Sequence, residues 1–334
     1  MRWMQVLIFA AALISTAAWA ADVDKPSAET PQDLAHRIVL WPGGTGPGSE
    51  RAPAQPTITD RGDDPKAMDR SISGIGQPYM IVYRPAHPNG TALLVTPGGG
   101  YARIVLDNEG ATLAPAFADR AGITLFVLRY RLPAEGHEQG RDVPLADAQR
   151  ALRLIRAQAD DYGIDPRRVG VMGFSAGGHV AASLATRFDQ KVYTPVDAAD
   201  QWSARPDFAL LVYPVIDVGR EIAHAGSRER LLGEHPSAQL MHDYSAQNQV
   251  TAQTPPTFLV AAQDDDIVPV ANTLVYHQAL LKAGVPAELH VFPSGGHGFG
   301  VRGIAGKTLQ AWPTLAIDWI ATQTAPAQPA SPAR

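Results

Sequence analysis

The chain has 334 residues, of which 45% are apolar and 18% charged, the balance of an ordinary globular protein. Its net charge of −5 and the lack of any run of Lys or Arg exclude the basic surface by which proteins bind nucleic acid. Because the sequence contains no cysteine, disulfide bonds and a lipid anchor on cysteine are excluded, and stability must come from a buried core.

The amino terminus has the pattern of a secretory signal peptide. A short basic start is followed by an apolar run over residues 6–14 and by small residues up to Ala20. Ala18 and Ala20 fit the A-x-A cleavage pattern, which predicts cleavage after Ala20 and a periplasmic or secreted protein. Since a transmembrane helix needs about 20 apolar residues, we expect no stable membrane span; an uncleaved amino-terminal anchor is the alternative.

The rest of the sequence predicts one domain with irregular ends. Residues 21–65 are predicted to be a polar leader and a loop rich in Gly, Pro and Asp, with a short apolar stretch at residues 38–42. Residues 66–324 are expected to form one α/β domain, because no repeat and no break in composition divides them. The polar segment at residues 218–250 is long enough to form a cap over a binding crevice. Residues 325–334, mostly Ala and Pro, are predicted to be disordered.

Apolar runs typical of buried strands alternate with helical patterns along this domain. The predicted strands cover residues 79–83, 92–96, 123–128, 169–172, 208–212, 257–260 and 288–292. The predicted helices cover residues 145–159, 176–187, 270–283 and 307–322. Because continuously apolar strands alternate with helices, we predict a mostly parallel central sheet with helices on both faces.

One motif carries the strongest chemical signal. The strand at residues 169–172 runs into Gly-Phe-Ser-Ala-Gly at residues 173–177, which matches the pattern G-x-S-x-G around Ser175. A serine on so sharp a strand-to-helix turn leaves little room for Cβ atoms two residues before and after it. The start of the following helix adds positive partial charge near developing negative charge. The motif alone is a weak signal, but its flanking strand and helix favour Ser175 as a nucleophile.

A glycine-rich loop follows the strand at residues 92–96. Its sequence is Pro-Gly-Gly-Gly-Tyr over residues 97–101, at the strand end where such a sheet places its ligand crevice. The backbone N–H groups of this loop can point at an oxyanion, together with the N–H of Ala176 just after the serine. An ordinary flexible turn is the alternative, and it would be the better one without Ser175 downstream.

Two further loops supply an acid and a base. Asp264, Asp265 and Asp266 follow the strand at residues 257–260, and His297 lies among glycines after the strand at residues 288–292. An acid in the first loop can accept a hydrogen bond from a histidine and hold its tautomer. The three carboxylates could instead bind a cation, but consecutive residues on a turn rarely aim at one point.

No metal and no cofactor are expected. The other histidines show no ligand spacing, so zinc is not implied. His179 lies four residues after Ser175 in a helix directed away from the turn, which favours a packing role over that of the base.

At these residues the sequence resembles the α/β-hydrolase esterases, in particular the acetyl-esterase and acetylxylan-esterase-like branch related to hormone-sensitive lipase. The resemblance covers about residues 79–320 and implies the α/β-hydrolase fold, whose order of serine, acid and histidine this chain shares. Residues 97–101 look like the HGGG loop of the family, with Pro97 where histidine often stands, which implies Gly99 and Gly100 as oxyanion donors. The D-x-x-V-P turn of the family selects Asp265 as the acid, with Asp264 and Asp266 as alternatives.

The resemblance implies a serine esterase without a cofactor, in which Ser175 forms an acyl-enzyme, His297 is the base and Asp265 orients it. Together with this resemblance to short-chain esterases, predicted export and the polar segment at residues 218–250 favour acetyl groups on plant polysaccharide such as xylan, or another short-chain ester. Tyr101 and Trp202 are candidate platforms for sugar rings, or else ordinary core and surface aromatics.

The sequence leaves two alternatives to a serine esterase. A peptidase of the prolyl-oligopeptidase kind shares the fold but generally adds a large propeller domain, for which we expect no room in this chain. A non-catalytic binding module on a hydrolase scaffold usually lacks the serine or the histidine, and both are present here.

Overall fold

The computed structural model describes residues 25–53, 55–62 and 67–325. The predicted signal peptide lies outside these residues, and so does the predicted disordered tail apart from Ala325. Among the described residues, no helix is both long and apolar enough to cross a bilayer.

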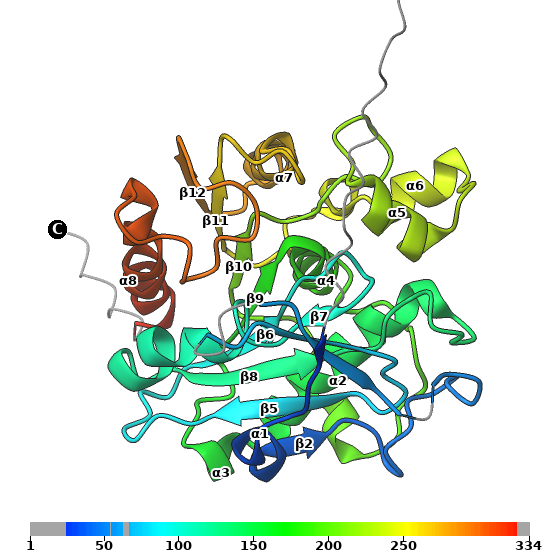
Figure 1. Cartoon of the computed structure of the whole chain (residues 1–334). Helices are drawn as coiled ribbons and strands as arrows, with labels where there is room; N and C mark the ends of the chain where they lie inside the picture. Colours follow the sequence, from blue (N-terminus) through cyan, green and yellow to red (C-terminus); the bar gives the residue numbers. More distant parts are fainter. Residues whose placement is uncertain (1–24, 54, 63–66, 326–334) are drawn as a thin grey trace, which may run out of the picture.

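An eight-stranded sheet forms the centre of the molecule, in the order β12-β11-β10-β9-β6-β8-β5-β2 (Figure 1). The strands from β12 to β8 in this order are parallel, and β5 is antiparallel to both of its neighbours. All seven predicted strands are present, and the predicted mostly parallel sheet is confirmed. The strands are β2 (Arg37–Val39), β5 (Tyr79–Tyr83), β6 (Ala92–Thr96), β8 (Thr124–Arg129), β9 (Val169–Phe174), β10 (Ala209–Val212), β11 (Thr257–Ala262) and β12 (Ala287–Phe292).

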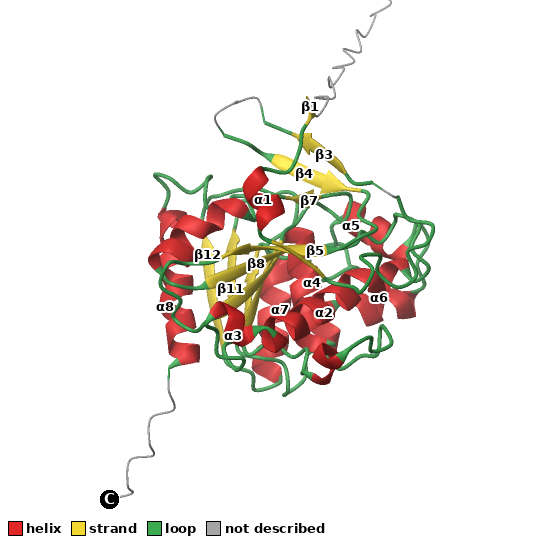
Figure 2. Ribbon diagram, turned by 90° about the horizontal axis from the view of Figure 1, so that it is seen from below, coloured by secondary structure: helices red, strands yellow, loops and turns green. Residues whose placement is uncertain are grey.

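Helices cover both faces of this sheet, as predicted (Figure 2). On one face Leu94 packs into a core shared with α2, α4 and α7, and on the other Leu93 and Val95 pack into a core shared with α8. This alternation follows from the two-residue period of a strand, which sends successive side chains to opposite faces. The helices are α2 (Val143–Ala157), α3 (Ala159–Tyr162), α4 (Ser175–Thr186), α7 (Ala271–Lys282) and α8 (Trp312–Thr324).

A second, four-stranded sheet lies apart from the first, at the top of Figure 2. It is antiparallel throughout and consists of β1 (Lys25–Pro26), β3 (Thr57–Asp60), β4 (Arg70–Ser73) and β7 (Ile104–Val105). The prediction of leader and loop over residues 21–65 is therefore wrong where β1, α1 (Pro31–Ala35), β2 and β3 form. These strands have only two to four residues, and β3 reads Thr-Ile-Thr-Asp. Only β2 overlaps the short apolar stretch that the sequence shows at residues 38–42, so the local pattern is too weak to predict strands here.

The segment at residues 218–250, expected as a possible cap, contains two short helices. They are α5 (Ala225–Leu232) and α6 (Ala238–Tyr244), and they lie side by side at one end of the molecule (Figures 1 and 2). Each begins with a side-chain cap, from His224 to the N–H of Ser227 and from Ser237 to the N–H of Leu240.

The carboxylate of Asp147 on α2 lies fully buried between three segments of the fold. It accepts hydrogen bonds from the Trp41 indole Nε1 at 2.8 Å and from the Arg131 backbone nitrogen at 2.9 Å. It also pairs with the Arg131 guanidinium at 2.8 Å, and both side chains are at most 1% exposed. Because Trp41 follows β2 and Arg131 follows β8, this one carboxylate joins α2 to the ends of two strands.

We expect the substitution Asp147→Ala to lower the free energy of unfolding by about 3–5 kcal/mol, because it leaves the buried Arg131 cation without its partner. Chemical denaturation measures the change. The matched control Asp318→Ala removes an exposed carboxylate on α8 and should change stability by at most about 0.5 kcal/mol. Equal losses in the two variants would contradict the role assigned to Asp147.

Candidate active site

Ser175 lies at the sharp turn between β9 and α4. Its φ of 51° is in the left-handed region, which residues with a side chain rarely adopt. The neighbouring glycines are required by close approach of the backbone. A Cβ at Gly177 would collide with the carbonyl oxygens of Thr96 and Pro97, and a Cβ at Gly173 would collide with the carbonyl oxygen of Gly177. The G-x-S-x-G pattern therefore reflects the space available around this turn.

His297 and Asp265 continue a chain of hydrogen bonds that begins at Ser175. The Ser175 Oγ lies 2.8 Å from His297 Nε2, and His297 Nδ1 lies 2.7 Å from Asp265 Oδ2. Because the buried carboxylate accepts from Nδ1–H, Nε2 carries no proton in the neutral ring and accepts from the serine hydroxyl. Such an arrangement can take the serine proton and make the oxygen a stronger nucleophile.

The three consecutive aspartates point in different directions. Asp265 faces His297 and also accepts from the backbone N–H groups of Ile267 and Val268, at 3.0 and 2.9 Å. Asp264 accepts from the N–H groups of residues 295 and 296, both at 2.8 Å, and so holds the loop that carries His297. Asp266 is exposed. No group of three or more possible ligand side chains within the described ranges is arranged to hold a metal ion.

Gly99 and Gly100 line a cavity of about 540 Å³ together with Ser175 and His297. Gly99 has φ 132°, and a Cβ there would collide with the carbonyl oxygen of Arg103, so a glycine is required. Within the part of the chain that the structure describes, the backbone N–H groups of Gly99 and Gly100 donate to no other group. These donors, with the N–H of Ala176 in the first turn of α4, can stabilise negative charge on an oxygen near Ser175.

The profile of a protein family described as the alpha/beta hydrolase fold matches residues 93–301. This region makes up more than half of the chain and contains Ser175, Asp265 and His297. The chain belongs to the α/β-hydrolase family. The fold expected from the sequence resemblance is thereby confirmed.

Two curated relatives and one solved structure are similar to this α/β hydrolase. An acetylxylan esterase of Xylanibacter ruminicola is 34% identical over 247 residues, which are 73% of this chain and 48% of that protein. Endo-1,4-beta-xylanase B of Butyrivibrio fibrisolvens is 40% identical over 209 residues, 63% of this chain and 32% of that protein. The chain thus spans about half or less of these relatives. An acetyl ester-xyloside bifunctional hydrolase from Caldicellulosiruptor lactoaceticus superposes with a TM-score of 0.70 at 35% identity, covering 91% of this chain and 98% of that one.

A buried network that the sequence analysis missed links the two glycine-rich loops of this α/β hydrolase. The Glu109 carboxylate accepts from the backbone N–H of Gly98 at 2.7 Å and from the Tyr213 hydroxyl at 2.9 Å. The same hydroxyl accepts from the N–H of Gly300 at 3.1 Å. The Tyr213 ring also lies edge-on to the His297 ring, with centroids 5.0 Å apart. Glu109 thus connects the glycine-rich loop at residues 97–101 to the loop that follows His297.

Burial sets the protonation of this network. It raises the pKa of the Glu109 carboxyl group, while the bonds from Gly98 and Tyr213 act in the opposite direction. Burial, reinforced by the charge of Glu109, raises the pKa of Tyr213 far above its usual range, so its hydroxyl stays a donor. In the sequence Glu109 belongs to no motif, and its role appears only when the fold brings it to Gly98 and to Tyr213, which is 104 residues away.

Neither Tyr101 nor Trp202 lies where it could stack on a sugar ring at this site, so the prediction of sugar platforms is wrong. Tyr101 is only 2% exposed, and its hydroxyl is bonded to His179 Nδ1 at 2.8 Å, so its ring offers no face to a ligand. Trp202 is 43% exposed but precedes β10, and residues before a parallel strand lie at the sheet edge opposite to Ser175. Its backbone oxygen accepts from Arg153 Nε of α2, and the cavity at Ser175 is not lined by it.

His179 has the packing role expected of it. Its Nε2 lies 2.7 Å from the backbone oxygen of Tyr244, so Nε2 carries the proton and Nδ1 accepts from the Tyr101 hydroxyl. Burial lowers the pKa of His179 to about 4, which keeps the ring neutral. His179 therefore joins the loop at residues 97–101 to the end of α6.

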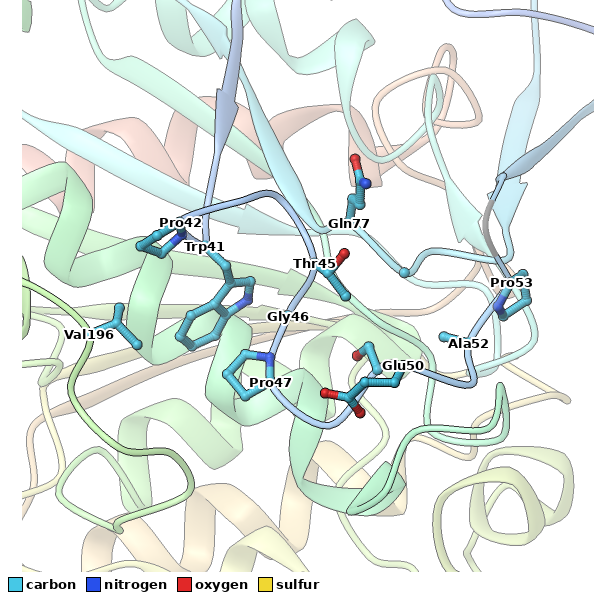
Figure 3. A pocket seen from close by; sticks show the side chains of 12 residues that line it. Trp41, Pro42, Thr45, Gly46, Pro47, Glu50, Ala52, Pro53, Gln77 and Val196 are labelled. Carbon is cyan, nitrogen blue, oxygen red and sulfur yellow. The ribbon is translucent and has the colours of Figure 1, made fainter.

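A second serine–histidine contact lies beside another cavity, of about 710 Å³, lined by residues such as Trp41, Pro47 and Gln77 (Figure 3). Ser49 lines this cavity, and its Oγ lies 2.9 Å from His137 Nδ1. Burial, and then the Arg131 cation, lower the pKa of His137 to about 4. Arg131 also donates to the Ser49 Oγ at 2.8 Å, which occupies a lone pair of the would-be nucleophile. Within the described ranges no carboxylate orients His137, so this pair lacks the arrangement found at Ser175.

A fluorophosphonate is expected to modify Ser175 and to leave Ser49 unmodified, because only Ser175 combines an oriented base with nearby N–H donors. Peptide mass spectrometry identifies the labelled residue. The substitution Ser49→Ala should leave labelling intact, whereas His297→Ala should abolish it. Labelled Ser49, or labelled Ser175 in the His297→Ala variant, would argue against this interpretation.

Proposed function

We propose that the protein is an exported serine esterase that removes acetyl or other short acyl groups from plant polysaccharide such as xylan. The observation that carries the proposal is the hydrogen-bonded chain from Ser175 through His297 to Asp265 beside the backbone N–H groups of Gly99 and Gly100, which donate to no acceptor among the described residues. The acetylxylan esterase relative and the acetyl ester-xyloside hydrolase structure support the substrate class. The signal-peptide pattern at residues 1–20 supports export.

The first half of the proposed reaction forms an acyl-enzyme. The Ser175 Oγ attacks the ester carbonyl carbon while its proton passes to His297 Nε2, and Asp265 stabilises the imidazolium that results. The carbonyl oxygen becomes an oxyanion and accepts hydrogen bonds from the backbone N–H groups near Gly99, Gly100 and Ala176. The tetrahedral intermediate then collapses, and His297 gives its proton to the oxygen of the departing alcohol.

The second half releases the acid by the same groups. His297 takes a proton from a water molecule, whose oxygen attacks the acyl carbon on Ser175. The same N–H groups hold the second oxyanion, and collapse returns the proton from His297 to the Ser175 Oγ as acetic acid leaves and then gives its own proton to bulk water. Every proton moves between the substrate, water and these two side chains, so the reaction requires no cofactor.

The purified protein is expected to release acetate from acetylated xylan, and Ser175→Ala to lower the rate roughly 10⁶-fold, below detection. The loss of the nucleophile removes the acyl-enzyme route, whereas Ser49→Ala should keep the rate of the unchanged protein. Enzymatic assay of acetate measures both.

The outcomes separate the parts of the proposal. If xylan stays intact while 4-nitrophenyl acetate is cleaved in a Ser175-dependent manner, the esterase stands and polysaccharide is the wrong substrate. If folded protein cleaves neither ester, the enzymatic function itself is wrong. Cleavage of a prolyl peptide bond in preference to esters would favour the peptidase alternative.

The substitution Glu109→Gln is expected to lower kcat for 4-nitrophenyl acetate by about 10-fold with little change in KM. Loss of an oxyanion donor outright costs about 10²–10³, and this change leaves the donors in place but loosens the loop that positions them. Steady-state kinetics measure kcat and KM separately, and thermal unfolding reports any general loss of structure. The control Glu221→Gln removes an exposed carboxylate before α5 and should leave kcat unchanged. A Glu109→Gln variant that loses stability but not kcat would contradict the positioning role.

A further inference from the structure

One wall of the cavity at Ser175 comes from the start of α5. His224, which caps this helix, and Arg230, within it, both line the cavity. They meet over Gly226, where an added Cβ would lie 2.9 Å from Arg230 Nη1 and 3.5 Å from His224 Cε1. A Cβ added to Gly100 would lie 3.7 Å from the same His224 Cε1. His224 therefore stands directly beside the loop of Gly99 and Gly100, and Arg230 lines the same cavity close to His224.

The hydrogen bonds of His224 fix which nitrogen faces the cavity as a donor. The backbone N–H of Ser227 donates to Nδ1 at 3.3 Å, and the Ser227 hydroxyl lies 2.8 Å from the same atom. A backbone N–H can only donate, so Nδ1 is unprotonated in the neutral ring and Nε2 carries the hydrogen. Burial, with contributions from His297 and Arg230, lowers the pKa of His224. His224 thus offers a neutral N–H donor to whatever occupies the cavity.

The charges around the cavity leave Arg230 without a carboxylate partner. Arg230 donates from Nη1 to the backbone oxygen of Gly226 at 3.0 Å, and it forms no ion pair within the described ranges. The acidic side chains of the lining are already bound. Asp69 accepts two bonds from Arg61, both at 2.8 Å, and Glu109 accepts those from Gly98 and Tyr213 described above. The charge of Arg230 therefore favours an anion in the cavity.

We propose that His224 and Arg230 bind a carboxylate on the alcohol part of the substrate, so that the preferred ester is an acetylated sugar acid. The planar fork of a guanidinium matches a carboxylate, and the Nε2–H of His224 supplies a further donor from the adjacent position. Because both side chains line the cavity that also contains Ser175, the carboxylate and the ester would belong to one small substrate in that cavity. This inference rests on the esterase function proposed above and adds the chemical class of its substrate.

Two matched sugars test the carboxylate subsite. An O-acetylated methyl glucuronoside and the methyl glucoside acetylated at the same positions differ only in carboxylate against hydroxymethyl at the sixth carbon. We expect kcat/KM to be about 10-fold higher for the glucuronoside, mainly through KM, which is the size expected for one hydrogen-bonded charge. Because the interaction is partly exposed, added salt should reduce this preference.

The variants keep the helix intact while removing the donors. Arg230→Gln should remove most of the preference for the glucuronoside. His224→Asn should reduce it, because Asn preserves the helix cap but lacks the distal N–H. Arg228→Gln removes a cation from the same helix that does not line the cavity, and it should leave the preference and both rates unchanged.

The possible results separate the carboxylate subsite from the esterase function on which it rests. Equal kcat/KM for the two sugars, a preference for the glucoside, or a glucuronoside preference that survives both variants overturns the carboxylate subsite. Hydrolysis of 4-nitrophenyl acetate in those cases leaves the esterase standing. If none of the three esters is cleaved by folded protein, the esterase function and the subsite fall together.

Discussion

The close approach between the end of β6 and the start of α4 is the constraint on which the site depends. The Thr96 hydroxyl donates to the backbone oxygen of Gly177 at 2.8 Å, and no side chain fits at Gly177. This contact brings the loop with Gly99 and Gly100 next to Ser175, which must then adopt a left-handed conformation. Such a conformation costs about 1–3 kcal/mol, a cost that the buried strand β9 offsets through its packing. Backbone proximity, more than any side chain, creates this geometry.

Hydrogen bonds from buried carboxylates then fix the loops that the sheet brings together. Asp264 holds the backbone of the histidine loop, while Asp265, its neighbour, holds the ring of His297. Glu109 joins the loop at residues 97–101 to Tyr213 and, through the Tyr213 hydroxyl, to Gly300. A buried donor or acceptor without its partner costs about 1–3 kcal/mol, so each bond favours one arrangement of the loops. These hydrogen bonds restrict the loops of the site to one arrangement, because any other arrangement would leave a buried polar atom without a partner.

The sequence predicts those features whose signals are local. Continuous apolar runs predict the central strands, and the glycines around Ser175 predict the turn, because both depend on neighbouring residues. The order of residues also anticipates that Asp265 and His297 approach Ser175, although their chemical roles remain predictions. Glu109 escapes the sequence because Tyr213, one of its partners, lies 104 residues away. His224 escapes because only the fold brings it to the cavity at Ser175, and the second sheet escapes because its strands are short and carry little apolar pattern. Tyr101 and Trp202 fail for a related reason: an aromatic residue type does not reveal whether its ring faces solvent or which edge of the sheet it occupies.

The second sheet changes what counts as the smallest folding unit of this chain. Strand β7 follows the loop at residues 97–101 and pairs with β4 at residues 71–72. These residues of β4 lie outside the region that matches the family. Strand β5 and the whole of α8 lie outside that region too, although both pack on the central sheet. A fragment trimmed to residues 93–301 would expose the open edge of β8 and uncover the part of one sheet face that α8 covers. A chimera with another α/β hydrolase would therefore need boundaries that keep each strand together with its pairing partner. Those boundaries lie outside the region of sequence similarity.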